Sequence, residues 1–434
     1  MTTTYLAPTI TREEDGRPAS PVPAPKEVTV RPGPALLNGI EHGPSLAAHR
    51  AQYGPIPHLD SKQLHALVKK VQMRGRGGAA FPFAIKLETV LKGSRPIMVV
   101  NMSEGELASA KDHALALTRP HLVLDGVVAT AKALRSRKVH VVLPGERPEA
   151  AAAMKRAIAE RRDGVNIYTT TAASRFVAGQ AKAVVELLSG RPNLPATSWA
   201  PEAVKGLKGR PTLLSNGETW ARVGLLVLRG AEEYMSIGTP EEPGATLLTM
   251  NMPGSVPIVF EAAYGDRLRD YIPQDRHGLP AMVGGFHGSW ATWETLASAK
   301  VSVNKMRAMG NALGAGLVLS SPECPVTLTA RTVEYLAGQS AQRCGPCFNG
   351  LPALAREVTA IHDGHGGLER VEQLAKLVVR RGACAHPDGT VRLVNSMLST
   401  FADEVAAHAK GGCTLKHGSR KLVGDSFNRI LEVA

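Results

Sequence analysis

Between residues 45 and 235 the pattern of hydrophobic and polar positions alternates between two periods. Short apolar or β-branched runs bounded by polar turns predict strands, and apolar positions three or four residues apart predict helices. The predicted strands lie at 95–102, 138–144 and 165–171, and the predicted helices lie at 45–54, 61–73, 121–136, 149–162 and 174–190. Strands that alternate with helices indicate an α/β layer with a largely parallel sheet.

The segment 61–73 is a representative predicted helix. Leu64, Leu67, Val68 and Val71 fall on one stripe at helical spacing. Ser61 stands just before this stripe, where a hydroxyl side chain can accept from the first free backbone N–H groups, so we expect it to be the N-cap.

Other parts of the chain follow different patterns. Residues 1–44 are rich in Pro and Gly without a helical period, which indicates an N-terminal extension. Residues 240–320 hold short β-like runs broken by Gly and Pro, which predicts a small α+β domain. Residues 325–434 predict a bundle of about four helices, the last of them over 390–410. We therefore expect the α/β domain over 45–235 to be followed by two smaller domains.

Composition narrows the class of protein. The 434 residues are 44% hydrophobic, which is enough for sizeable cores and excludes a disordered chain. No apolar run reaches the ~18 residues that a membrane span needs. The N-terminal sequence has no apolar signal core, and five cysteines are too few for a disulfide scaffold. These features predict a cytoplasmic protein.

The excess of basic over acidic side chains indicates which kinds of molecule the chain could bind. The chain carries 51 basic and 38 acidic side chains, a formal net charge of +13. The basic residues form no long block, and aromatic residues are only 4%, so we do not expect nucleic acid to be a partner. A basic face that docks an acidic protein is the better interpretation, with a merely solvated surface as the alternative.

The first candidate for chemistry is the glycine-rich stretch Gly75–Pro82, GRGGAAFP, with Lys86 shortly after it. Glycines let the backbone approach a phosphate and point N–H groups at it, and a lysine can meet the phosphate charge. The stretch matches neither the dinucleotide fingerprint nor the Walker pattern. A simple tight turn is therefore the alternative.

Two polar turns follow apolar runs. Residues 101–106, NMSEGE, come directly after the strand at 95–100, and residues 215–219, SNGET, follow a second apolar segment. Ligands of open α/β sheets bind at the carboxyl ends of strands, and helix N-termini attract anions. The alternatives are solvated turns, and helix capping by Ser215 or Asn216.

The third candidate is a CxxC pair, Cys344 and Cys347, with Cys384 about forty residues later. Close thiols plus a distant one are typical of iron–sulfur clusters, and zinc is the runner-up. A thioredoxin-like pair is disfavoured because the motif follows a helix. Cys324 and Cys413 are left over, and we interpret them as inert thiols.

In their order, these motifs resemble the flavoprotein, NADH-oxidising subunit of respiratory complex I and its relatives in NAD-linked hydrogenases and formate dehydrogenases. The resemblance covers about residues 45–420. The matching stretches are GRGGAAFPFAIK, NMSEGELASAKDH, GQAKAV, GRPTLLSNGET, VGGFHGSW, SAQRCGPCFNG and RRGACAHPDG. It implies a Rossmann-like FMN domain, a small ubiquitin-like (SLBB-type) domain and a helical bundle that carries a [4Fe-4S] cluster.

The resemblance also implies which residues bind FMN, although Ser103, Gly105, Leu107 and Ser215 depart from the family pattern. The implied cofactor-binding residues are Gly75, Arg76, Gly77, Gly78, Phe81, Lys86, Asn101, Glu104, Asn216 and Thr219.

The implied nucleotide site departs further from the family. The family's adjacent pair of glutamates falls on Gln180 and Ala181, and alanine cannot accept a hydrogen bond. Hydride transfer requires the nicotinamide to be held against the flavin. Glu104 and Gln180 are the residues that we expect to orient it, and NADH is the expected donor.

The implied cluster site keeps three thiols. The family's first cysteine falls on Ala341, and the others fall on Cys344, Cys347 and Cys384. A fourth ligand could come from Cys324, Cys413, His386 or a partner. An open iron, a three-iron cluster and loss of the cluster are the alternatives.

The resemblance therefore implies a flavin and iron–sulfur oxidoreductase that passes electrons from NADH through FMN and the cluster to a protein acceptor. An acidic ferredoxin or a thioredoxin-like iron–sulfur subunit fits the positive charge. Peripheral attachment to a membrane complex on the cytoplasmic side remains open. The alternative is a non-catalytic docking or assembly subunit that kept the fold but lost NADH oxidation.

Overall fold

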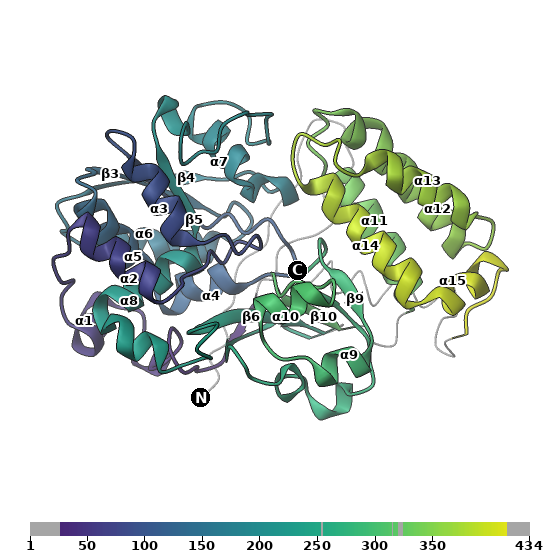
Figure 1. The fold of residues 1–434 in the computed structure, drawn as a ribbon, viewed down its shortest axis with the longest axis horizontal. Coiled ribbons are helices and arrows are strands. Elements are labelled where there is room, and N and C mark those ends of the chain that lie inside the picture. Colours follow the sequence, from purple (N-terminus) through teal and green to yellow (C-terminus); the bar gives the residue numbers. More distant parts are fainter. Residues whose placement is uncertain (1–26, 253–254, 315, 320–323, 415–434) are drawn as a thin grey trace.

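The computed structural model describes residues 27–252, 255–314, 316–319 and 324–414. Three neighbouring parts follow one another along the chain: an α/β part drawn in purple to teal, a green sheet with two short helices, and a group of yellow-green helices (Figure 1).

A four-stranded parallel sheet organises the α/β part. Its strand order is β4-β3-β2-β5, and every neighbouring pair is parallel. The strands are β2 (Ile97–Asn101), β3 (Lys138–Leu143), β4 (Asn166–Thr171) and β5 (Thr212–Asn216). The central strand β2 is almost entirely buried, which explains why it is a continuous apolar run. The predicted α/β layer with a parallel sheet is confirmed.

Helices surround this sheet, and the tightest contact lies between α5 and α8. A Cβ atom added to Gly126 of α5 would lie 1.9 Å from the carbonyl oxygen of Trp220 in α8, so only glycine allows this approach. The helices of this part are α1 (Leu46–Tyr53), α2 (Ser61–Lys70), α3 (Phe83–Leu91), α4 (Lys111–Thr118), α5 (Pro120–Ala133), α6 (Pro148–Ala159), α7 (Ala181–Leu188) and α8 (Gly217–Met235), with short turns η1 (Ile40–His42), η2 (Phe176–Gly179) and η3 (Leu207–Gly209).

Two details of the prediction were wrong. The N-cap of α2 is Asp60 rather than Ser61, because the Asp60 carboxylate accepts from the first-turn N–H groups and Gln63 completes a capping box. The single helix expected over 174–190 is two elements, η2 and α7. It breaks at Gln180, whose backbone is extended, with φ −69° and ψ 141°.

A second, six-stranded sheet has the order β1-β7-β6-β10-β8-β9. Its strands are β1 (Thr29–Val30), β6 (Ala245–Asn251), β7 (Ile258–Ala263), β8 (Ala281–Val283), β9 (Ser289–Ala291) and β10 (Gly316–Leu319), accompanied by α9 (Trp293–Ser298), α10 (Val303–Ala308), η4 (Leu268–Tyr271) and η5 (Gln274–Arg276).

The first described segment of the chain packs on this sheet. Strand β1 pairs with β7, and the Glu261 carboxylate of β7 accepts from the backbone N–H groups of residues 35–37. Val28 and Val30 are buried. Residues 27–44 of the expected extension are therefore part of the folded body, and residues 1–26 lie outside the described residues.

Five helices pack together in the described part of the C-terminal region, around a core that includes Leu336, Leu354 and Val394. They are α11 (Pro325–Gly338), α12 (Leu351–His362), α13 (Leu368–Val378), α14 (His386–Thr400) and α15 (Ala402–Ala409), with a π-turn η6 (Pro346–Gly350) ahead of α12. The single helix expected over 390–410 is divided at Phe401.

Among the described residues, no helix has both the length and the apolar character that a membrane crossing requires.

Candidate functional site

The two polar turns predicted from the sequence meet at one edge of the parallel sheet. Strands β2 and β5 are neighbours, and Asn101 and Asn216 at their carboxyl ends are register partners. Asn216 is also the N-cap of α8, since its side-chain oxygen accepts from the Thr219 N–H at 3.2 Å. The amide of Asn216 donates to the carbonyl oxygen of Arg76 at 3.2 Å and so ties the glycine-rich loop to this edge.

The glycine-rich loop presents its backbone beside the start of α8. Gly75 N–H donates to Phe81 O at 2.8 Å and closes the loop, and Arg76 N–H donates to Thr219 Oγ1 at 2.9 Å. A Cβ atom added to Gly77 or Gly78 would meet no atom of the described residues within 4 Å. Open space over glycine N–H groups at a helix N-terminus suits the phosphate of FMN, so the residues present fit this cofactor.

The Arg76 side chain points away from that open space and into the protein. Its guanidinium stacks on the Tyr264 ring at 4.9 Å, and its Nε lies 3.8 Å from Glu218 Oε1. Glu218 also pairs with Lys111 at 2.9 Å and Arg222 at 3.5 Å. Burial raises the pKa of Glu218, but the surrounding cations outweigh burial and hold that pKa below its usual range. Arg76 therefore anchors the loop through both its backbone, which is bonded to Thr219 and Asn216, and its side chain.

Lys86 and Phe81 flank the same loop. Lys86 Nζ, on α3, donates to the carbonyl oxygen of Leu214 in β5 at 2.9 Å and lies 3.4 Å from Glu202 Oε1. The Lys86 ammonium therefore lies beside Leu214, which is two residues before Asn216 in β5. Phe81 is 48% exposed. Contact of either side chain with FMN remains a prediction.

Glu104 lies in the turn after β2 and is fully engaged with protein groups. Its carboxylate pairs with Arg147 and accepts from Ser109 Oγ at 2.6 Å and from the backbone N–H groups of Asp112 and His113 at 2.9 Å. Burial raises the pKa of Glu104, but Arg147 and these hydrogen bonds lower that pKa by more than burial raises it. The carboxylate therefore stays ionised. In this structure Glu104 fixes the turn and the start of α4, and its role toward nicotinamide remains a prediction.

Sequence reasoning missed the buried charges behind this edge, namely Lys111, Asp112 and Glu218. Burial, the repulsion of Glu104 and the repulsion of Glu218 raise the pKa of Asp112 to about 7. In the sequence, KDH and GET place charges next to apolar residues, but that pattern alone does not predict that the charges are buried. Only the fold reveals that these charges converge.

The three expected cluster cysteines come together from two segments of the helical part, Cys344 and Cys347 between α11 and α12 and Cys384 just ahead of α14. Cys344 and Cys347 are hydrogen-bonded to each other, and Cys384 interacts electrostatically with both. Burial and the neighbouring Cys344 raise the pKa of the Cys347 thiol to about 12. Three facing thiols from two segments are a donor set that suits an iron–sulfur cluster.

His386 is not free to be a fourth cluster ligand. Its Nε2 lies 2.8 Å from the carbonyl oxygen of Leu336, to which it donates, and its Nδ1 therefore accepts from His287 Nε2 at 3.0 Å. Burial lowers the pKa of His386 to about 4.

Cys324 and Cys413 are at the wrong place for this cluster. Cys347 lies in η6, directly ahead of α12, whereas Cys324 and Cys413 lie beside His408, whose ring contacts the carbonyl oxygen of His362 at the other end of α12. The 12 residues of α12 span about 18 Å. Of the sources considered for a fourth ligand, a partner subunit is left, and an open iron position, a three-iron cluster and loss of the cluster are the alternatives.

The flavin edge and the cysteines are joined by two consecutive residues. The Gly179 carbonyl oxygen accepts from Asn101 Nδ2 at 2.7 Å. The next residue, Gln180, donates a side-chain hydrogen bond to Cys384, which lowers the pKa of that thiol against the effect of burial. Because the helix is broken between η2 and α7, the adjacent residues Gly179 and Gln180 contact the flavin edge and the cluster cysteines, respectively.

Two family models match separate regions of the chain. The Nuo51 FMN-binding domain matches residues 68–225, which hold the parallel sheet and the glycine-rich loop. The NADH-ubiquinone oxidoreductase-F iron-sulfur binding region matches residues 327–408, which hold the three cysteines.

Similar proteins carry a matching description. An NADH-quinone oxidoreductase subunit of Rhizobium meliloti is 29% identical over 86% of this chain and 94% of its own length. The corresponding NADH-quinone oxidoreductase subunit of Escherichia coli is 29% identical over 79% of this chain and 83% of its own length. A chain of an NAD+-reducing [NiFe]-hydrogenase shares the fold, with a TM-score of 0.76, 24% identity, and coverage of 87% of this chain and 67% of that one. The chain thus belongs, as a divergent member, to the family of FMN- and iron–sulfur-binding flavoprotein subunits of the NADH-quinone oxidoreductases.

Proposed function

We propose that this chain is an electron-transfer subunit that takes electrons from NADH at FMN and passes them through an iron–sulfur cluster to a protein acceptor. The observation that carries the proposal is the pair Gly179 and Gln180. Gly179 is bonded to the flavin edge through Asn101, and Gln180 is bonded to the cluster thiol Cys384. Adjacent residues therefore link the two expected redox sites.

The flavin residues have separate tasks. FMN, when bound, converts a two-electron donation into one-electron steps. The backbone N–H groups of Gly77 and Gly78 face the phosphate, and Lys86 supplies a positive charge near the phosphate. The bonds of Gly75 N–H to Phe81 O and of Arg76 N–H to Thr219 Oγ1 hold the loop in shape. Asn101, Asn216 and Thr219 hold the two strand ends and the loop in register.

The cluster residues act as thiolates. Cys344, Cys347 and Cys384 supply three ligands, and Gln180 donates a hydrogen bond to the last of them. Hydrogen bonds to ligand sulfurs stabilise their negative charge and tune the reduction potential. The fourth position belongs to an acceptor subunit or stays open.

NADH is held with fewer protein acceptors than the family pattern supplies. Gln180 directs its amide donor at Cys384, and Ala181 has no acceptor. We therefore expect NADH to bind, with Glu104 and Gln180 positioning the segments around the nicotinamide, but more weakly than in a protein with both glutamates.

The remaining parts are assigned by the family resemblance. We assign residues 240–320, with most of the second sheet, to an SLBB-type ubiquitin-like domain. The helices of residues 325–434 form the iron–sulfur domain. The relatives are named as subunits of quinone oxidoreductases, so we expect this chain to work within a complex. A net charge of +13 suits an acidic acceptor such as a ferredoxin or a thioredoxin-like iron–sulfur subunit, on the cytoplasmic side of a membrane complex.

The flavin site is tested with Gly77→Val in the full chain. A side chain at residue 77 would fill the open space over the loop, so we expect FMN affinity to fall by about tenfold or more, which corresponds to ~1.4 kcal/mol. Quenching of flavin fluorescence measures the affinity. Gly367→Val is the matched control, because Gly367 is also exposed and without close neighbours among the described residues. Equal FMN affinity in both variants would contradict the assigned site.

A non-catalytic docking subunit is the second candidate. Ala181 and Ala341 favour it, because each removes a group that the family pattern supplies. Under this alternative the purified protein is colourless, whereas the proposed function requires flavin bands and an iron–sulfur shoulder in the visible spectrum.

A further inference from the structure

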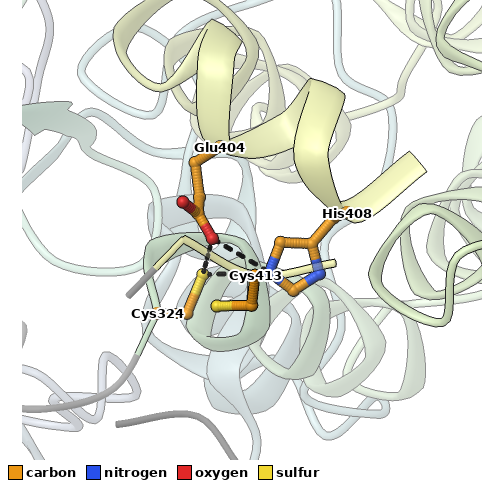
Figure 2. A group of neighbouring side chains, drawn as sticks. All are labelled: Cys324, Glu404, His408 and Cys413. Atoms are coloured by element: carbon orange, nitrogen blue, oxygen red, sulfur yellow. Dashed lines mark hydrogen bonds and ion pairs between the residues drawn. The ribbon is translucent and has the colours of Figure 1, made fainter. Parts of the chain in front are cut away.

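A second group of metal-binding side chains lies at the far end of the helical part. Cys324, Glu404, His408 and Cys413 each offer one ligand atom, and these four atoms all lie within 4.8 Å of one another. Figure 2 shows the four side chains pointing toward a common centre from the start of α11, from α15 and from the segment after α15. Nothing in the proposed electron route uses them.

The distances between these atoms suit a tetrahedral ion. Cys324 Sγ lies 3.2 Å from His408 Nε2 and 3.5 Å from Glu404 Oε1, and the last two atoms are 3.3 Å apart. Bond lengths of about 2.0–2.3 Å to zinc put tetrahedral ligands about 3.3–3.8 Å from one another. The ligand atoms of Cys324, Glu404 and His408 are thus already spaced nearly as they would be around one ion, and Cys413 Sγ, within 4.8 Å of all three, is close enough to complete the set.

The surroundings hold these ligands in place. Glu404 and His408 are four residues apart on one face of α15. His408 Nδ1 lies 3.1 Å from the carbonyl oxygen of His362 and donates to it, which leaves the Nε2 lone pair facing Cys324. Metal-bound histidines characteristically carry such a second hydrogen bond. Cys324, Glu404 and His408 are buried.

This group is separate from the expected iron–sulfur cluster. Cys347 precedes α12, and His408 touches the last residue of the same helix, so the length of α12, about 18 Å, separates them. A four-iron cluster at Cys344, Cys347 and Cys384 cannot include this second group.

We infer that Cys324, Glu404, His408 and Cys413 bind one zinc ion. Two thiolates, one imidazole and one carboxylate fill all four positions of a tetrahedral shell, which is typical of a structural rather than a catalytic site. The mixture of sulfur and nitrogen ligands selects zinc over magnesium or calcium. The ion would crosslink α15 and the segment after it to the start of α11, and so would hold the two ends of the helical part together.

The test is metal analysis of the full chain, produced in medium with added zinc and dialysed against a weak chelator. We expect about one zinc ion per chain, because four ligands complete one shell. Cys413→Ser replaces the least buried ligand and should lose most of the zinc while keeping its iron. Cys344→Ser is the matched control, and should lose iron while keeping zinc. X-ray absorption at the zinc edge should show sulfur and nitrogen or oxygen neighbours together.

Three results would overturn the inference. One is a wild-type chain that holds its iron but no zinc. Another is a Cys413→Ser variant that keeps the full zinc content, with His408→Gln giving the same result. The third is a native disulfide between Cys324 and Cys413, found by peptide mapping without reduction, since that bond would consume both thiolates.

Discussion

Glu218 shows what a single residue does for the candidate site. It is completely buried at the start of α8, and three cations, Arg76, Lys111 and Arg222, surround it. Since Arg76 belongs to the glycine-rich loop, this buried cluster holds the loop against the helix whose N-terminus faces the proposed phosphate. The sequence places GET near an apolar run, but burial of a charge among other charges depends on the fold and was not predictable.

Glu218→Gln should therefore destabilise the protein strongly. Removing the carboxylate leaves the buried cations Lys111, Arg76 and Arg222 without their shared partner, and the expected loss is about 3–5 kcal/mol of unfolding free energy. Denaturant unfolding followed by circular dichroism measures it. Glu233→Gln is the control, because Glu233 lies on the same helix in an exposed ion pair with Arg229. A loss in Glu218→Gln no larger than in the control would contradict this role.

Gln180 carries the second prediction at this scale. Gln180→Glu replaces a donor toward Cys384 with a negative charge, so the reduced cluster becomes less stable. We expect the reduction potential of the cluster to fall, on the order of 60 mV for a tenfold change in a one-electron equilibrium. A redox titration followed by electron paramagnetic resonance measures it. Gln180→Leu removes the donor without adding charge and should give a potential between those of the wild type and Gln180→Glu. An unchanged potential in both variants would mean that Gln180 does not act on the cluster.

At the scale of elements, prediction succeeded where periodicity was visible. Strands β2 and β3 are largely apolar runs, β4 is rich in β-branched threonine, and all three were expected close to their observed bounds. Helix α4 was not expected, because all eight of its residues are buried and it has no polar face to reveal a period. The break at Gln180 was also missed, since it follows from contacts of η2 with Asn101 rather than from a local signal.

Helices α1 and α5 share a buried histidine cluster with a consequence for pH. Burial, together with Arg161 and His49, lowers the pKa of His121 to about 4, while an unfolded histidine keeps its usual value of 6.5. A depressed folded pKa contributes stability at high pH, and this stability is lost as pH falls from about 6.5 to 4 because unfolding takes up a proton.

We therefore expect the wild-type chain to lose more unfolding free energy between pH 6.5 and pH 4 than His121→Gln loses. Thermal unfolding at a series of pH values measures the difference between the two curves. His42→Gln, which replaces an exposed histidine of η1, should follow the wild-type curve. Parallel curves for wild type and His121→Gln would contradict the assignment.

At the scale of the whole molecule, the order of motifs proved more informative than any one of them. The glycine-rich loop, the two polar turns and the cysteines are each weak signals, but they occur in the order of one family, and the fold gathers the first three at one sheet edge. The fourth cluster ligand was not predictable, because the first cysteine of the family pattern is Ala341 and no nearby residue announces a replacement.

The proposed route carries electrons from NADH to the cysteine-bound cluster within this one chain. An anaerobic titration of the purified full chain with NADH, followed by flavin absorbance and by electron paramagnetic resonance, examines that route from end to end. We predict that NADH bleaches the flavin band and that the signal of a reduced cluster then grows, with both cofactors present before the titration. Flavin and iron that are bound but do not respond to NADH would contradict the proposed route.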